Sequence, residues 1–437
     1  MKGARVAILG AARSGVAAAK GVLAAGGIPT LYDRRSIEDL GLDVDVPVVG
    51  GWDAPFSRQV ADLVVTSPGV PMQSPVLLGS IASGVPVIGE IELAYRIAKA
   101  PIVAITGTNG KSSTTAMAYL ALKSMKANPI LCGNIYGSGY EEIPLTEAAL
   151  LATPDQVLVA EISSFQLEWV ERFRPRAAAI TNITEDHLDR YGGSQSLYAA
   201  TKRRIYRQME GDDTIVLPQG FEPMPENATV RTFGSRDGDA WSDADAIHVL
   251  GKQVARSRLP FDEPHNLLNA QAALLLAVGF GGLDRFESAC EGLEGFAPLD
   301  NRLEDVGERD GVRIVNNTMC TNPAAVIASS ESLTGRQHLL IGGRRKGLPF
   351  GVVGEYLRRT GHRAYLYGAD GAEIAEQMGG GFPVFETLQE AFAEAAKSAH
   401  NGEVIMLAPG CASQDQFEDF RHRGEVFKNI AKEWLYR

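Results

Sequence analysis

Residues 101–113 read Pro-Ile-Val-Ala-Ile-Thr-Gly-Thr-Asn-Gly-Lys-Ser-Ser and contain the strongest fold signal of the chain. An apolar stretch of strand length, Ile102–Ile105, runs through a glycine turn into Ser113–Met125, which has helical character. Glycines let the backbone fold around phosphates, the helix start offers unpaired N–H groups, and a lysine and a hydroxyl add a charge and a Mg²⁺ ligand. The stretch therefore predicts a nucleotide-phosphate site, made by Gly107, Thr108, Asn109, Gly110, Lys111, Ser112 and Ser113.

Strands and helices alternate on both sides of this stretch. The expected strands are Val6–Leu9, Thr30–Tyr32, Leu63–Thr66, Val85–Ile88, Val157–Glu161, Ala177–Thr181, Val312–Val315, His338–Ile341, Ala364–Tyr367 and Glu403–Leu407. This alternation predicts an α/β fold with parallel sheets. Because the pattern restarts near residues 95 and 298, we expect three domains: a Rossmann-like domain at 1–94, a P-loop-type ATPase domain at 95–298 and a Rossmann-like domain at 299–437. The polar stretch Pro223–Asp243 is expected to be an irregular, exposed hairpin region.

Composition narrows the class of protein. The 437 residues carry 42 Lys and Arg against 53 Asp and Glu, a formal charge of −11, which disfavours nucleic-acid binding through bulk charge. Four separated cysteines without a C-x-x-C pair predict neither a disulfide framework nor a zinc site. Apolar runs such as Ala272–Phe280 are far shorter than the ~20 residues of a membrane span, so we expect a cytoplasmic protein that acts on small molecules.

Four further features could carry chemistry, each beside a structural alternative. Gly10–Gly15 could form a phosphate-binding loop with Asp33 as the ligand of a ribose, or it could form a tight turn that binds no ligand. Glu161 ends a predicted strand and suits a metal ligand or a structural cap. His187 suits a metal or substrate ligand, or a structural histidine. Lys202 lies in the helix-like run Ser194–Met209, where a lysine ordinarily faces solvent.

The ordered combination of Lys111, Glu161, His187 and Lys202 resembles the ATP-dependent Mur ligases and their folylpolyglutamate synthase relatives. The segments Glu161–Leu167, Asn182–Tyr191 and Pro409–Phe417 resemble the branch that adds D-glutamate. The resemblance covers essentially the whole chain. It implies a peptidoglycan-synthesis ligase in which ATP activates the carboxylate of UDP-N-acetylmuramoyl-L-alanine as an acyl phosphate and the amine of D-glutamate then attacks.

The resemblance also implies the roles of particular residues. Lys111, Glu161, His187 and Lys202 would be catalytic, with two Mg²⁺ ions held by Glu161 with Ser112 or Ser113 and by His187 with a carbamylated Lys202. The UDP-sugar residues would be Ser14, Gly15, Asp33, Arg34, Ser67, Gly69, Asn134 and His187, so the first loop is not a nicotinamide site. Further ATP contacts would be Asn269, Arg302 and Asn317, although Asn269 alone suits a helix-surface amide. The glutamate residues would be Thr321, Lys346, Ser413 and Phe420, in a protein expected to be monomeric.

Two stretches depart from the family pattern. Asn316–Asn322 stands where the family has Asn-Asp-Ser-Lys-Ala-Thr-Asn, so Asn317 and Met319 replace an acid and a lysine. Tyr136–Glu142 is an apparent insertion after Asn134. Three alternatives stay open: a Mur-type ligase with altered glutamate stereochemistry, a folylpolyglutamate synthase-like ligase, and a nucleotide-binding regulator without ligase activity. Domain closure is expected, because the reactants are assigned to different domains.

Overall fold

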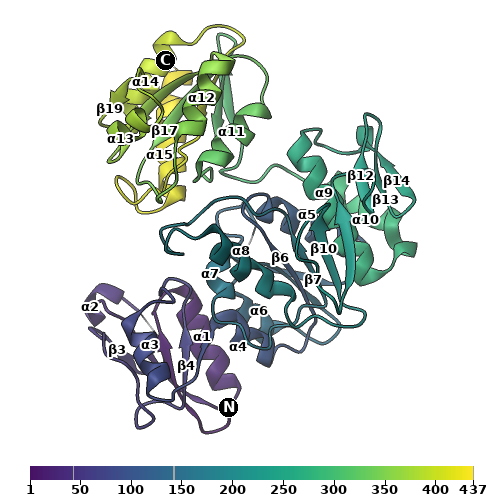
Figure 1. Ribbon diagram of the computed structural model, residues 1–437, viewed down its shortest axis with the longest axis vertical. Coiled ribbons are helices and arrows are strands. Elements are labelled where there is room, and N and C mark those ends of the chain that lie inside the picture. The colour runs from purple at the N-terminus through teal and green to yellow at the C-terminus, as the bar shows by residue number, and fades with distance from the viewer. Residues whose placement is uncertain (43, 141–142, 437) are drawn as a thin grey trace. The chain divides into compact units, whose positions relative to one another are not determined.

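The amino-terminal part of the chain forms a five-stranded parallel sheet in the order β3-β2-β1-β4-β5. The computed structural model (Figure 1) describes residues 1–42, 44–140 and 143–436. β1 lies at the centre of the sheet, and its apolar residues Val6–Leu9 are all buried. The elements are β1 (Arg5–Leu9), α1 (Arg13–Ala24), β2 (Ile28–Tyr32), α2 (Ile37–Leu40), β3 (Val48–Val49), β4 (Leu63–Thr66), α3 (Pro75–Ala82), β5 (Val87–Gly89) and α4 (Glu90–Ile97).

The central sheet has nine strands in the order β14-β13-β12-β11-β10-β9-β6-β8-β7. β6 (Ile102–Thr106) lies between β8 and β9, all three parallel, and leads through the predicted phosphate loop into α5 (Lys111–Ser124). The other strands are β7 (Pro129–Gly133), β8 (Val157–Glu161), β9 (Ala177–Ile180), β10 (Thr214–Pro218), β11 (Thr229–Phe233), β12 (Ala240–Ser242), β13 (Ala246–Val249) and β14 (Lys252–Ala255). The helices are α6 (Leu145–Leu151), α7 (Ser164–Leu167), α8 (Gln195–Arg203), α9 (Pro264–Gly281) and α10 (Phe286–Glu294), with short 3₁₀ turns at Arg204–Tyr206, Arg256–Arg258 and Leu283–Arg285.

The expectation for Pro223–Asp243 was wrong. This stretch contains β11 and β12, which extend the central sheet in parallel to β10, and the antiparallel hairpins follow later, between β12, β13 and β14. β11 reads Thr-Val-Arg-Thr-Phe, and β-branched and aromatic residues favour a pleated strand even in a polar stretch.

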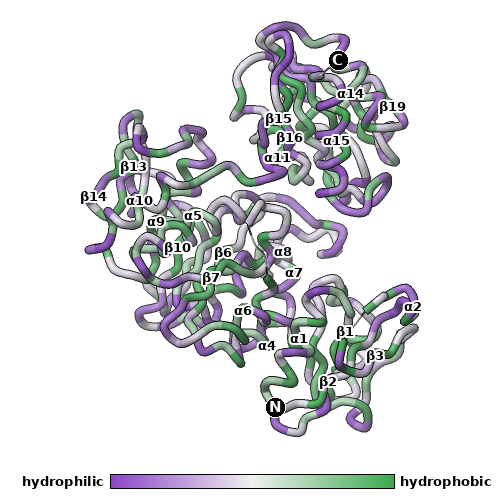
Figure 2. Tube along the Cα trace, turned by 180° about the vertical axis from the view of Figure 1, so that it is seen from behind, coloured by the Kyte–Doolittle hydropathy of each residue, from purple (hydrophilic) through white to green (hydrophobic). Residues whose placement is uncertain are grey.

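The carboxyl-terminal part forms a six-stranded sheet in the order β15-β16-β20-β17-β18-β19, parallel except for the β15–β16 pair. Its strands are β15 (Glu304–Arg309), β16 (Val312–Asn316), β17 (Gln337–Gly342), β18 (Arg363–Tyr367), β19 (Val384–Phe385) and β20 (Val404–Leu407). Its helices are α11 (Pro323–Glu331), α12 (Gly351–Thr360), α13 (Gly371–Gln377), α14 (Leu388–Ser398) and α15 (Phe420–Leu435). Figure 2 shows apolar residues concentrated along the strands, such as β1, β6 and β16. The α/β fold with largely parallel sheets is confirmed.

Contacts divide the chain into two compact units. The first contains Met1–Tyr136, Glu141–Ile183 and Ala199–Phe296, and the second contains Gly137–Tyr140, Thr184–Tyr198 and Ala297–Arg437. Within the first unit α4 is fixed to the central part: Glu90 accepts a hydrogen bond from the Thr146 N–H, and Glu92 accepts from three consecutive N–H groups at residues 171–173. The boundaries 1–94, 95–298 and 299–437 stay a prediction. In the part of the chain that the structure describes, no helix is long and apolar enough to cross a bilayer.

Candidate active site

The phosphate loop between β6 and α5 requires glycine at two positions. Gly107 has a φ of +150°, and a Cβ there would lie 1.9 Å from the Thr181 hydroxyl. Gly110 has a φ of +80°, and its Cβ would lie 2.4 Å from the Asn269 Oδ1. Lys111 Nζ donates a hydrogen bond to the Thr108 carbonyl at 2.9 Å. The predicted loop therefore has the narrow, left-handed backbone that a phosphate cradle requires.

The end of β9 supports the opposite side of this loop. The Asn182 side chain accepts from the Asn109 N–H and donates to the Asn109 carbonyl, both at 3.0 Å. The Thr181 hydroxyl donates to the same carbonyl at 2.5 Å. Sequence reasoning did not assign Thr181 or Asn182 a role, although Asn182 opens a segment that the family resemblance singled out. Both residues fix the loop rather than project from it.

Asn269 lies beneath the phosphate loop and not on a solvated helix surface, so that alternative was wrong. It is on α9, is only 7% exposed, and accepts a hydrogen bond from the Thr114 hydroxyl at 3.2 Å. Its Oδ1 also faces the position where a Gly110 side chain would be. α9 therefore places this buried amide against the loop.

Glu161 ends β8 at the carboxyl edge of the parallel strands, where ligands bind in open α/β sheets. The side chain is 2% exposed, and its Oε1 accepts a hydrogen bond from the Asn134 amide at 3.2 Å. Its Oε2 is buried without a hydrogen-bond partner among the described residues. An unpartnered carboxylate oxygen in the interior is costly. The Ser112 and Ser113 side chains are also buried.

These oxygens fit a magnesium ion. Mg²⁺ prefers oxygen ligands and is commonly held by one or two carboxylates together with substrate phosphates. The residues that the structure describes contain no cluster of three His, Cys, Asp or Glu side chains suited to a metal. A site of one carboxylate with serine hydroxyls matches a metal that the substrate helps to bind.

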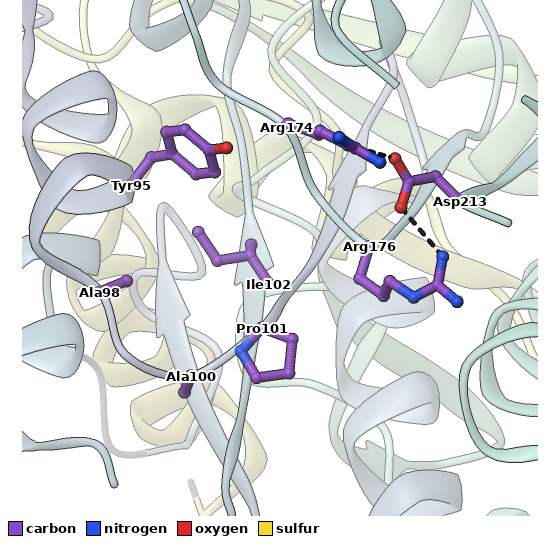
Figure 3. Close-up of a pocket in the computed structure, with 8 residues that line it drawn as sticks. All are labelled: Tyr95, Ala98, Ala100, Pro101, Ile102, Arg174, Arg176 and Asp213. Carbon is purple, nitrogen blue, oxygen red and sulfur yellow. Dashed lines mark hydrogen bonds and ion pairs between the residues drawn. The ribbon is translucent and has the colours of Figure 1, made fainter. Parts of the chain in front are cut away.

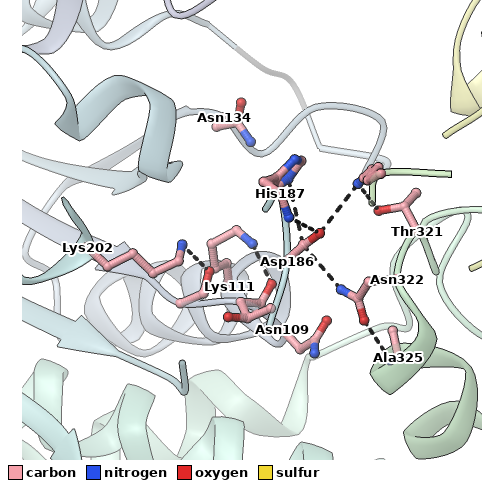
Figure 4. Close-up of polar contacts among 12 residues, drawn as sticks. Asn109, Lys111, Asn134, Asp186, His187, Lys202, Thr321, Asn322 and Ala325 are labelled. Carbon is pink, nitrogen blue, oxygen red and sulfur yellow. Dashed lines mark hydrogen bonds and ion pairs between the residues drawn. The ribbon is translucent and has the colours of Figure 1, made fainter. Parts of the chain in front are cut away.

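Lys202 is buried against the phosphate loop and does not face solvent, as a lysine in such a helix ordinarily does. The residue lies near the end of α8 and is 1% exposed. Its Nζ donates a hydrogen bond to the Gly107 carbonyl at 2.6 Å (Figure 4). The first unit thus brings together Lys111, Glu161 and Lys202 from three elements of one sheet edge.

A second polar cluster belongs to the second unit. Lys346 Nζ donates to the Thr321 hydroxyl at 3.0 Å and lies 3.7 Å from Asp186 Oδ1. Asp186 is buried and accepts from the Asn322 amide at 3.2 Å. Figure 4 shows Asp186 at the centre of these contacts. The structure thus joins two predicted glutamate residues with Asp186, to which the sequence analysis assigned no role.

His187 is held in an unusual backbone conformation beside this cluster. Its φ is +53°, and its N–H donates to the Asp186 side chain at 2.9 Å. The ring is partly exposed, with Nε2 3.6 Å from Asp186 Oδ2. A non-glycine residue in the left-handed region is uncommon and often lies at a functional site. His187 belongs to the second unit, whereas Glu161 and Lys202 belong to the first.

Buried polar groups also brace the loops around the other predicted residues of the second unit. Arg423 is fully buried and donates to the Thr318 carbonyl at 2.9 Å and to the Cys411 carbonyl at 3.2 Å. The Thr318 hydroxyl donates to the Phe420 carbonyl at 2.8 Å. Ser413 is buried two residues beyond Cys411. Arg423 was missed because a buried arginine on an amphipathic helix looks like a surface charge in sequence.

Asn317 acts as a brace in this structure. It is buried, accepts a hydrogen bond from the Leu303 N–H at 3.2 Å and donates to the Ser329 hydroxyl at 2.7 Å. These bonds fix the backbone next to Arg302. The ATP contacts assigned to Asn317 and Arg302 stay predictions.

The amino-terminal sheet carries a pocket of about 680 Å³ at the carboxyl ends of β1, β2 and β4. Predicted residues that line it are Ser14, Asp33, Arg34, Ser67, Gly69 and Asn134, and sequence reasoning missed Arg35 and Trp52, which also line it. Gly15 lies against the Gly10 carbonyl, where a Cβ would come within 1.8 Å. The predicted UDP-sugar residues of the first loop therefore surround one pocket.

Asp33 fixes the loop of this pocket. Its carboxylate accepts from the Ala11 N–H at 2.9 Å and from three N–H groups of Arg35, each at 3.0 Å. The Arg35 guanidinium holds the pKa of this carboxyl well below its usual range. Because a carboxylate has about four acceptor positions, Asp33 is already fully engaged with the protein. Its direct contact is with the loop, through which it would shape the ligand site.

Another pocket, of about 300 Å³, lies at the amino end of β6 (Figure 3). Asp213 there pairs with the Arg174 Nε at 2.6 Å and with the Arg176 Nη1 at 3.0 Å. Parallel α/β sheets bind ligands at the opposite, carboxyl end of their strands. This pocket is therefore structural, with its arginines engaged by an acidic side chain.

Comparison with known proteins agrees with this geometry. The model of the Mur ligase middle domain matches residues 105–277, and that of the Mur ligase glutamate ligase domain matches residues 301–411. The UDP-N-acetylmuramoylalanine–D-glutamate ligase of Koribacter versatilis is 36% identical over 452 residues, covering 99% of this chain and 98% of the relative. The protein of the same name from Escherichia coli strain 536 is 34% identical over 449 residues, covering 99% of each chain.

Solved structures show the same fold. The UDP-N-acetylmuramate-alanine ligase of Thermotoga maritima aligns with a TM-score of 0.62 at 18% identity, over 98% of this chain and 99% of that one. The MurF ligase of the same organism, solved in complex with ADP, aligns with a TM-score of 0.60 at 16% identity, over 86% and 90% of the two chains. From its matched domains, its full-length relatives and its fold, the chain belongs to the Mur ligase family.

Proposed function

We propose that this protein is an ATP-dependent ligase that joins D-glutamate to UDP-N-acetylmuramoyl-L-alanine. The observation that carries the proposal is the identity of 34–36% to relatives named for this reaction across 99% of the chain, the amino-terminal sheet and its pocket included. A folylpolyglutamate synthase-like ligase has no need of that nucleotide-sugar pocket. Lys111, the buried Lys202 and Glu161 at the phosphate loop favour an enzyme over a nucleotide-binding regulator.

The reaction would proceed in two steps. An oxygen of the alanyl carboxylate attacks the γ-phosphorus of ATP, ADP leaves, and an acyl phosphate forms. The amine of D-glutamate then attacks the acyl carbon, the tetrahedral intermediate collapses with loss of phosphate, and the amine releases a proton. Negative charge accumulates on oxygen in both steps, so the protein contributes mainly by positioning groups and placing cations. At the phosphates, Lys111 supplies the positive charge and the N–H groups at the start of α5 supply hydrogen-bond donors.

Glu161 with Ser112 or Ser113 would hold one Mg²⁺, and His187 with a carbamylated Lys202 would hold a second. Bound Mg²⁺ would neutralise charge on the phosphate oxygens. Burial of Lys202 supports the carbamate, because a charged ammonium loses its hydration in the interior of a protein. In the carbamate the amine nitrogen bonds to the carbon of CO₂ and releases a proton, which leaves a carboxylate-like group.

The cluster around Lys346 would bind the amino acid. A dicarboxylate that leaves water needs cationic and hydrogen-bonding partners. Lys346 and the Thr321 hydroxyl are already joined at 3.0 Å, and Asp186 helps to orient the ammonium. Ser413 and Phe420 would complete the pocket. The monomeric state and the cytoplasmic location stay predictions from sequence.

Product formation with each glutamate enantiomer tests the proposal. Purified protein is given ATP, Mg²⁺ and UDP-N-acetylmuramoyl-L-alanine together with either D- or L-glutamate, and ADP and the amide product are measured. We expect both to appear with D-glutamate. Product with L-glutamate alone would contradict the stereochemistry, and ATP hydrolysis without an amide would support a regulator.

A further inference from the structure

A cation and an aromatic ring meet close in sequence to residues that line the amino-terminal pocket. The Arg13 guanidinium lies over the Tyr136 ring, 5.0 Å from its centroid. Arg13 begins α1, and its neighbours Ala12 and Ser14 both line the pocket. Tyr136 follows β7, two residues beyond Asn134, which lines the same pocket. The pair therefore connects the Gly10–Gly15 loop after β1 with the loop after β7.

This bridge lies between two ends of the site with different chemistry. The Gly10–Ser14 backbone at the start of α1 suits a diphosphate, because helix N-termini present N–H groups to anions. Beyond the other end, the Asn134 amide contacts Glu161, the carboxylate assigned to Mg²⁺ near the reacting group. A nucleotide sugar that reaches from one end to the other would place its sugar beside Arg13 and Tyr136.

The two side chains suit an acetylated sugar. A hexose ring has an apolar C–H face that can rest on an aromatic ring and a polar rim that accepts hydrogen bonds. A guanidinium offers five N–H donors in a rigid plane, and its position over the ring limits the orientations it can take. Sequence reasoning did not assign either residue, and Tyr136 begins the apparent insertion Tyr136–Glu142, of which residues 141 and 142 lie outside the described part.

We propose that Arg13 and Tyr136 form the surface that contacts the N-acetylated sugar of the substrate and sets the preference for the nucleotide sugar over the bare nucleoside diphosphate. This inference rests on the proposed function, which supplies the ligand. The two residues are specificity determinants, and the reacting atoms lie elsewhere, at Lys111 and Glu161.

Calorimetric titration without ATP or glutamate tests the inference. The probes are UDP-N-acetylmuramoyl-L-alanine and UDP, and the variants are Arg13→Gln, Tyr136→Leu and the double variant. For each single variant we expect the Kd of the nucleotide sugar to rise about 5- to 20-fold, and that of UDP to change less than about twofold. The double variant should lose no more affinity for the nucleotide sugar than the single variant that binds it more weakly, because the two residues act as a pair.

Two control variants separate this contact from general damage. Tyr136→Phe keeps the ring and should bind both probes like the wild type. Lys123→Gln removes a matched cation, which lies 5.8 Å from the Tyr119 ring on α5, and should also leave both affinities unchanged. Circular dichroism and thermal melting confirm that each variant is folded.

The outcomes distinguish this inference from the proposed function. The sugar contact would be overturned if the variants lost equal affinity for UDP and for the nucleotide sugar, or lost affinity for neither. It would also be overturned if Tyr136→Phe bound the nucleotide sugar as weakly as Tyr136→Leu. A wild-type protein that shows no preference for the nucleotide sugar would overturn it as well. Selective binding that depends on Arg13 and Tyr136 would support it, even if ATP and D-glutamate then gave no amide, a result that would contradict the proposed function alone.

Discussion

Replacing Gly110 with alanine should disable the phosphate loop. The residue has a φ of +80°, where an L-residue with a Cβ is strained by roughly 1–2 kcal/mol. The new Cβ would lie 2.4 Å from Asn269 Oδ1, so that amide must move. Its movement would break the 3.2 Å bond from the Thr114 hydroxyl, a loss of about 0.5–1.5 kcal/mol.

Together these effects amount to about 1.5–3.5 kcal/mol of unfolding free energy. The assay is urea denaturation followed by circular dichroism, with KM for ATP measured in parallel. We expect that KM to rise at least about tenfold, because the loop N–H groups lose their alignment with the phosphates.

Gly220 provides a matched control. It has nearly the same φ, +78°, but a Cβ there would meet nothing within 4 Å. Gly220→Ala should therefore show only the backbone strain, with KM for ATP unchanged. The stability difference between the two alanine variants isolates the clash, and adding Asn269→Ala to Gly110→Ala should remove it. Equal destabilisation by the two alanine variants, or an unchanged KM for ATP in Gly110→Ala, would refute the reasoning.

Three other predictions concern single polar side chains. Lys202→Ala should abolish ligation, and acetate or formate should restore part of it; full activity without rescue would exclude the carbamate role. Lys346→Gln removes a charged donor from Thr321 and should raise KM for D-glutamate about 10- to 100-fold, with KM for ATP unchanged; equal changes in both constants would argue against a glutamate contact. Burial lowers the pKa of His338, whose Nε2 lies 2.8 Å from Glu403. The unfolded chain therefore takes up a proton at this histidine near pH 6.5, whereas the folded chain does so only at lower pH, so the free energy of unfolding should be full above about pH 6.5 and fall below it. Urea midpoints measured from pH 5 to 8 should depend less steeply on pH in His338→Gln than in the wild type. The same pH dependence in both proteins would contradict the assignment.

Local sequence was sufficient for the strands that the sequence analysis expected and for the phosphate loop. The bounds of the strand at Ile102–Ile105 and of the helix after it were predicted to within two residues. Apolar periodicity and the glycines between the two elements are local signals. The same logic failed for Pro223–Asp243, where pairing with β10 stabilises strands in a polar stretch. Tertiary pairing there outweighs local composition.

The environment of each polar side chain could not be predicted from local sequence. Lys202 looked like a solvated lysine and Asn269 like a surface amide, yet both are buried against the glycine loop. Asp33, predicted to contact the substrate, also accepts hydrogen bonds from Ala11 and Arg35, partners that local sequence did not indicate, and its contact with the substrate stays a prediction. Burial and partner choice depend on residues from distant parts of the chain, such as Gly107 beside Lys202.

The sequence by itself determined the α/β fold, the position of the phosphate loop and the family resemblance, because these depend on spacing along the chain. Only the tertiary structure decided which groups meet. It left Glu161 Oε2 buried without a partner, joined Lys346 to Thr321 and Asp186, and brought Arg13 over Tyr136. The physical reason is that each parallel sheet places the loops after its strands at one edge. Loops that follow strands of different sheets then contact one another within a unit, so residues far apart in sequence become neighbours.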